Sequence, residues 1–221
     1  MRALGKRVDP KGSREFKSRP LRFDSFFMNK VKYLLTYRYA EIIHDLTVKF
    51  TRRYVLSNLS NLGNLRPDFR TADQMDQAAR SGKQNIVEGV SKSITSTQGT
   101  IKLLGVAKAS FEELLTDYED FLRQNDLEIY PKVDPRVTEF RRLAYRLSAL
   151  SNLSDLSYLG NLRERPTLFE KPEEDANFLL TLCHLESYLL DKQIKAAEKK
   201  FIKEGGYTEN LARKRREFRG Y

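Results

Sequence analysis

Two histidines and one cysteine are the side chains best suited to catalysis or metal binding. Neither His44 nor His184 has a second ligand at a metal-binding spacing such as His-x-x-x-His. Cys183 precedes His184, and neighbouring helical residues point about 100° apart, which disfavours a nucleophile and base pair. Gly82-Lys83 lacks the upstream glycine and the following Ser or Thr of a phosphate-binding loop. We therefore expect no enzymatic activity, metal or cofactor. The histidines should pack as ordinary polar residues, and the alternative is that they face each other. Cys183 should be a buried, inert thiol.

Most of the positive charge lies at the two ends of the chain. Residues 1–22 carry +6 and residues 207–221 carry +3, so only +1 of the net +10 remains between them. Lys and Arg neutralise phosphates and release counterions, so basic arms on a neutral scaffold favour binding to RNA or DNA. A solvated tail is the alternative. The arm residues expected to bind nucleic acid are Arg2, Lys6, Arg7, Arg213, Lys214, Arg215 and Arg216. Aromatic side chains that could stack on bases lie close by: Phe16, Phe23, Phe218 and Tyr221.

A polar stripe opposite Gly82 is the second candidate surface. It would be solvated if Asp76 pairs with Arg80 and Gln84 with Glu88, each pair contributing about 0.2 to 0.5 kcal/mol. Contact with nucleic acid or with another subunit are the alternatives. The candidates for nucleic-acid binding are Arg80 and Lys83, and those for an oligomer interface or helix packing are Gly82, Gln84, Asn85 and Glu88.

Apolar residues at steps of three and four predict the helices that position these side chains. Four long helices are expected, at roughly 30–54, 72–92, 96–124 and 173–204. The second and third would begin with capping boxes, Thr71 with Gln74 and Thr95 with Gln98. A shorter helix, 135–150, would follow Asp134 as cap. The expected fold is all-α, an antiparallel four-helix bundle with one short accessory helix. The third helix would carry acidic residues on its outer face: Glu112, Glu113, Asp117, Glu119 and Asp120.

Two insertions built on Ser-Asn-Leu repeats, 56–66 and 148–163, interrupt this pattern. Their leucines recur every third residue, a period that cannot form one stripe on an α-helix. We interpret them as expanded loops, with leucines that pack together or bind a partner as the alternative. The domains expected are a basic arm at 1–29, the bundle at 30–206 and a basic tail at 207–221.

Composition indicates where the protein acts. No run of about 18 apolar residues could span a membrane, and residues 1–30 lack the apolar centre of a secretory signal. A single cysteine excludes an intramolecular disulfide. A cytoplasmic location is expected.

Several segments of the predicted helices resemble the bacterial four-helix-bundle family, which includes proteins encoded in intervening sequences of large-subunit ribosomal RNA genes. In the second and third helices they are AARSGKQNIVEG at 78–89 and AKASFEEL at 107–114. YEDFLR at 118–123, DPRV at 134–137 and YLLDKQI at 188–194 resemble the subgroup called four-helix-bundle suffix proteins. The accessory variability determinant of diversity-generating retroelements resembles the chain more distantly.

The resemblance implies a homo-oligomer, commonly a pentamer, with nucleic acid and a reverse transcriptase as partners in the retroelement branch. We therefore expect a non-catalytic homo-oligomeric bundle that binds RNA or DNA, as an accessory to a reverse transcriptase or another RNA or DNA enzyme. A structural or protein-binding adaptor without nucleic-acid binding is the alternative.

Overall fold

The computed structural model describes residues 31–57, 67–149 and 166–220. All regular structure in these ranges is helical, which confirms the predicted all-α class. The elements are α2 (Leu35–Phe50), the π-helical turn η1 (Thr51–Val55), α3 (Phe69–Lys92), α4 (Thr97–Gln124), α5 (Pro135–Ser148), α6 (Pro172–Glu204) and α7 (Tyr207–Arg219).

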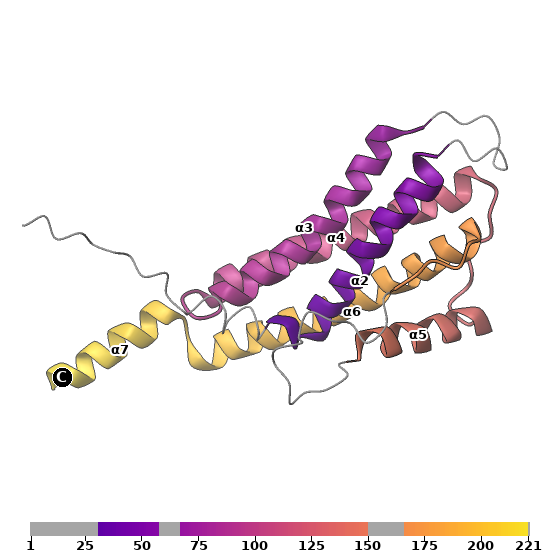
Figure 1. Ribbon diagram of the computed structural model, residues 1–221. Coiled ribbons are helices and arrows are strands. Elements are labelled where there is room, and N and C mark those ends of the chain that lie inside the picture. Colours follow the sequence, from indigo (N-terminus) through magenta and orange to yellow (C-terminus); the bar gives the residue numbers. More distant parts are fainter. Residues whose placement is uncertain (1–30, 58–66, 150–165, 221) are drawn as a thin grey trace, which may run out of the picture.

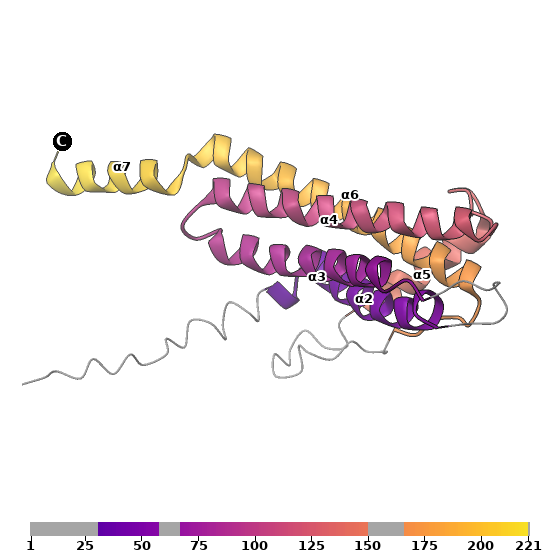
Figure 2. The same ribbon diagram turned by 90° about the horizontal axis from the view of Figure 1, so that it is seen from above.

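The helices pack as a bundle, with α7 outside it (Figures 1 and 2). α3 packs along α4, α4 along α6, and α2 against both α3 and α6. α5 is the short helix that covers one side, where it contacts α6 and α2. None of the described helices is long and apolar enough to cross a membrane.

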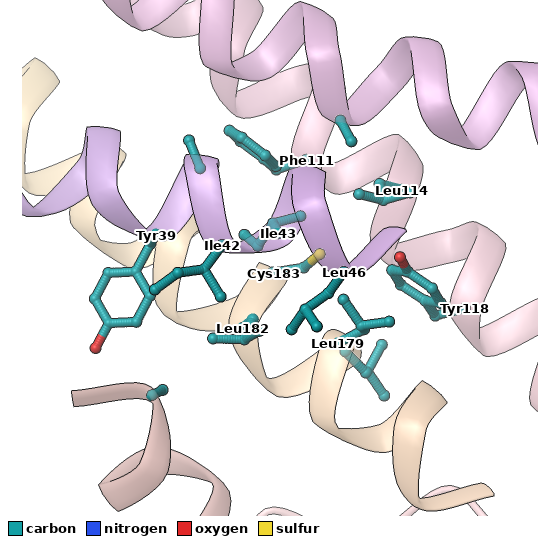
Figure 3. Close-up of a cluster of buried hydrophobic side chains, with 14 of the residues drawn as sticks. Tyr39, Ile42, Ile43, Leu46, Phe111, Leu114, Tyr118, Leu179, Leu182 and Cys183 are labelled. Atoms are coloured by element: carbon teal, nitrogen blue, oxygen red, sulfur yellow. The ribbon is translucent and has the colours of Figure 1, made fainter. Parts of the chain in front are cut away.

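The core forms where the predicted apolar stripes meet (Figure 3). On α2, Tyr39, Ile42 and Leu46 are buried, and Ile42 and Leu46 point toward Leu179 and Leu182 of α6. The ring centroid of Phe50 lies 5.2 Å from that of Tyr118, in an edge-to-face arrangement. The burial of these residues confirms the predicted stripes. Burial of one apolar face per helix is what stabilises helices in a bundle.

The predicted capping boxes were wrong in both long central helices. α3 begins earlier than expected, because the Asp68 carboxylate accepts a hydrogen bond from the Thr71 amide at 3.0 Å. α4 is capped by Ser96, whose hydroxyl accepts from the Gly99 amide at 3.0 Å. The predicted cap of α5 is confirmed, since Asp134 accepts from the Arg136 amide at 2.7 Å.

Gly82, one of the candidates for helix packing, lies in a close contact with an aromatic ring of α4. A Cβ added at Gly82 would lie 2.5 Å from Cζ of Phe111, which is itself fully buried. The Phe111 ring of α4 occupies the space that a side chain at this position would need, so α3 and α4 pack closely there.

The end of the chain differs from the expected tail, because residues 207–219 form α7. α2 also extends as the π-helical turn η1 to Val55, one residue beyond the predicted end. The arm at 1–29 and nearly all of both insertions lie outside the described residues. Ser148, the first residue of the second insertion, belongs to α5.

Candidate nucleic-acid interface

The second half of α6 lies along the start of α4, and α7 continues from it beyond the bundle (Figures 1 and 2). The last buried residue of α6 is Leu190, and α7 contains none. From Asp191 onward the sequence of α6 is dominated by Lys, Glu and Ala, which form helices well but supply little apolar area for burial. We call Lys192–Arg219 the basic projection.

Two glycines set the direction of α7. Gly205 ends α6 with a φ of +73°, a conformation that residues with a Cβ rarely adopt, and its amide donates to the Phe201 carbonyl at 2.9 Å. The Gly206 amide then donates to the Glu209 carboxylate at 2.9 Å, which caps the first turn of α7. Asn210 donates to the Glu204 carbonyl at 2.9 Å and ties the two helices together. Hydrogen bonds at the end of α6 and at the start of α7 therefore hold the bend between the two helices.

Much of the positive charge of the basic projection has no acidic partner. Three of its cations do form ion pairs: Lys195 with Asp191 at 2.6 Å, Lys200 with Glu204 at 4.0 Å and Arg213 with Glu217 at 3.9 Å. Seven further exposed cations have no ion pair with any described residue: Lys192, Lys199, Lys203, Lys214, Arg215, Arg216 and Arg219. Exposed, uncompensated cations on an ordered helix can neutralise phosphates with little loss of existing interactions.

α7 also has an apolar side. At about 100° per residue, Tyr207, Leu211 and Phe218 fall within about 40° of one another around the helix. Their exposed fractions are 50%, 44% and 93%. Arg216 and Arg219 lie on other sides of the helix, so α7 offers both rings and cations to a partner.

The polar residues predicted to form one surface on the second helix, α3, have different partners from those expected. Arg80 is exposed and forms no ion pair with any described residue, so the predicted pair of Asp76 with Arg80 was wrong. Asp76 accepts a hydrogen bond from the Thr51 hydroxyl at 3.0 Å. Lys83 donates to Nδ1 of His44 at 3.1 Å. Burial and the nearby Lys83 lower the pKa of His44, which favours the neutral imidazole. His44 thus contacts α3, and does not face His184.

The remaining candidates on α3 have separate environments. Gln84 and Glu88 are exposed and form no hydrogen bond with each other in the described structure, so that predicted pair was also wrong. The Asn85 amide donates to the Ser81 carbonyl at 2.9 Å, within its own helix and not to a neighbouring helix. Lys83 packs toward α2, whereas α7 continues from the far end of α6, so the structure does not bring these two groups of cations together.

Arg2, Lys6 and Arg7 lie outside the described residues. Arg213, Lys214, Arg215 and Arg216 all lie exposed on α7. Cys183 is fully buried, and burial raises the pKa of its thiol, as an inert packing role requires. Within the described ranges, no group of three or more His, Cys, Asp or Glu side chains could hold a metal ion.

Glu186 is a buried carboxyl group that the sequence analysis overlooked. It is fully buried on α6, and neither carboxyl oxygen has a hydrogen-bond partner among the described residues. Burial raises its pKa well above the usual range of Glu. Its position was readable from the sequence, because Leu179, Cys183, Glu186 and Leu190 follow steps of four, three and four.

The fold and the interface together define an all-helical bundle protein with an exposed basic helix. The chain matches no protein-family model, no curated protein and no solved structure. The likeness to the bacterial four-helix-bundle family therefore stays a prediction from the sequence.

Proposed function

We propose that the protein is a non-catalytic, homo-oligomeric bundle that binds RNA or DNA through the basic projection. The observation that carries this proposal is the row of exposed Lys and Arg residues without acidic partners between Lys199 and Arg219. Each phosphate neutralised by such a cation releases condensed counterions, which is the main source of affinity that does not depend on base sequence.

An oligomer strengthens the proposal, because several copies of the basic projection would act on one strand and raise the effective concentration of cations. We infer an antiparallel four-helix arrangement of α2, α3, α4 and α6 in each subunit, and a pentamer as the assembly. In this proposal the amino-terminal arm, with Arg2, Lys6 and Arg7, adds to the same binding. A reverse transcriptase or another RNA or DNA enzyme is the protein partner that we propose.

The test compares two triple variants with equal loss of charge. Arg215, Arg216 and Arg219 are changed to Gln in one, and Lys102, Arg123 and Arg142, exposed on the bundle, in the other. Binding of a labelled 20-nucleotide strand and of a duplex is measured by fluorescence anisotropy at low salt. We expect about tenfold or greater weakening in the α7 variant, because three phosphate contacts are lost. Equal weakening in both variants, or no binding by the parent, would contradict the proposal.

A protein-binding adaptor is the second candidate, and the acidic side of α4 favours it. Burial, with Glu113 and Asp120 nearby, raises the pKa of Asp117 to about 6. A groove of about 290 Å³ between α3 and α4 is lined by Asp73 and Glu113, among others. A basic partner would relieve the repulsion between these carboxylates. Capture of a basic protein partner that is lost on changing Glu113 and Asp117 to Asn or Gln, with no binding to nucleic acid, would support this candidate.

A further inference from the structure

A cavity lies beside the first half of α6, at the end of the helix away from α7. It has a volume of about 460 Å³ and is bounded by the end of α4, the loop between α4 and α5, α5 itself and α6. Val137, Leu180 and Leu185 contribute apolar surface, whereas Lys132, Arg141 and Tyr188 contribute charge and an aromatic ring. Its size falls within the range of about 300 to 1,000 Å³ that is usual for small-molecule sites.

The loop that forms one wall of the cavity is held by a buried amide. Asn177 is 1% exposed, and its carbonyl oxygen accepts from the Tyr130 amide at 2.8 Å. Its amide nitrogen donates to the Glu128 carbonyl at 2.8 Å. The Tyr130 hydroxyl donates to Glu173 at 2.7 Å, and the Arg136 guanidinium lies 3.4 Å from the centre of the Tyr130 ring. The wall is thus fixed to α6, so a ligand would find the cavity already formed.

The chemistry of the cavity suits a planar ring that carries a negative charge. Tyr188 is 59% exposed and offers an aromatic face. Lys132 and Arg141 form no ion pair with any described residue, so both can neutralise an anion. Glu119 and Thr181 also line the cavity and can hydrogen-bond with ring N–H groups. A nucleobase with its phosphate combines these properties.

One face of α6 connects the cavity to the basic projection. His184, Tyr188, Lys192, Lys199 and Lys203 lie within about 100° of one another around the helix. The Lys192 ammonium lies 5.3 Å from the centre of the Tyr188 ring. From residue 184 to residue 203 the helix rises about 28 Å. Lys192, Lys199 and Lys203 lack ion pairs within the described structure, so this face offers cations at intervals between the cavity and α7.

The geometry points to single-stranded RNA or DNA as the ligand, with one unpaired base in this cavity and the following phosphates along the lysine face of α6. This inference rests on the proposed function, and deepens it by choosing single strands over duplex. A base inside a duplex is stacked on both sides, and cannot enter a cavity unless it is extruded.

The test is the change Tyr188→Ala, with Tyr145→Ala as the matched control, because Tyr145 is an exposed tyrosine on α5 that does not line the cavity. Arg141→Ala is compared with Arg142→Ala in the same way. Affinities for a labelled 12-nucleotide single strand and for the matched duplex are measured by anisotropy. We expect Tyr188→Ala to weaken single-strand binding about five- to 150-fold, the range for loss of one stacked base, and to leave duplex binding unchanged. Arg141→Ala should weaken single-strand binding in the same selective way.

A set of single strands, each with one 2-aminopurine at a different position, reports by fluorescence which base enters the cavity. We expect one position whose fluorescence changes on binding to the parent but not to Tyr188→Ala. If the parent binds nucleic acid but Tyr188→Ala and Tyr145→Ala have equal effects, the cavity inference is wrong and the proposed function stands. If the parent binds neither probe, both are wrong.

Discussion

At the scale of single residues, two glycines in the hairpin of α3 and α4 have opposite surroundings. A Cβ at Gly82 would meet the buried ring of Phe111, whereas one at Gly105 would meet no atom within 4 Å. We expect Gly82→Ala to lower the free energy of unfolding by about 1 to 3 kcal/mol through overpacking. Gly105→Ala should raise it by about 0.5 to 1 kcal/mol, because alanine favours the helix. Urea unfolding measures both, and shifts of the same sign would contradict this account.

Glu186 should give the protein an unusual dependence on pH. Because its folded-state pKa is raised above the unfolded value of about 4.5, its contribution to stability is full below that pH and is lost as the pH rises. The loss amounts to about 1.4 kcal/mol for each pH unit between the two pKa values. Glu186→Gln should remove this slope and stabilise the protein at neutral pH, whereas Glu112→Gln, at an exposed site, should not. Unfolding midpoints between pH 4 and 8 test this, and an unchanged slope in Glu186→Gln would contradict it.

The same residues show what the sequence could reveal at this scale. Gly82 stood out because a glycine in the middle of a buried stripe needs a reason. The caps of α3 and α4 were misplaced because Thr71 with Gln74 and Thr95 with Gln98 have the spacing of a capping box. Asp68 and Ser96, which lie close to these threonines and are of types preferred over Thr as caps, form the local hydrogen bonds instead.

At the scale of elements, periodicity located α2 to α5, because each buries an apolar stripe. α6 was also located, although it is buried on all sides from Asp175 to Cys183 and on one side only farther along. The same reasoning failed at α7, whose apolar residues are few and none of which is buried in the described structure. The cavity beside α5 was also missed, since it depends on how the loop after α4 is held by Asn177. No local pattern indicates that contact, which joins residues 47 positions apart.

The insertion at 56–66 gives an element-scale prediction. If it is only an expanded loop, replacing it with a short Gly/Ser turn should preserve helicity and assembly, because loop length changes stability slowly. Circular dichroism and light scattering measure the two properties. Loss of the oligomer would show that the leucines of the insertion help to hold subunits together.

At the scale of the whole molecule, we expect a closed homo-oligomer, with a pentamer as the favoured form. Light scattering at micromolar concentration should give a mass several times that of one chain. Removing α7 should leave the helical content of the bundle unchanged, since none of its residues is buried. A monomeric parent would contradict the assembly.

The salt dependence of nucleic-acid binding tests the central claim most directly. The logarithm of the binding constant for a single strand is measured against the logarithm of salt concentration, for the whole chain and for a chain ending at Gly205. Each phosphate contact contributes a slope of about −0.7 with single strands. α7 carries four cations without a described ion pair, so its removal should weaken binding strongly and flatten the slope by about 3. An absence of binding at low salt, or equal affinity and slope for the two chains, would contradict the claim that the basic projection binds nucleic acid.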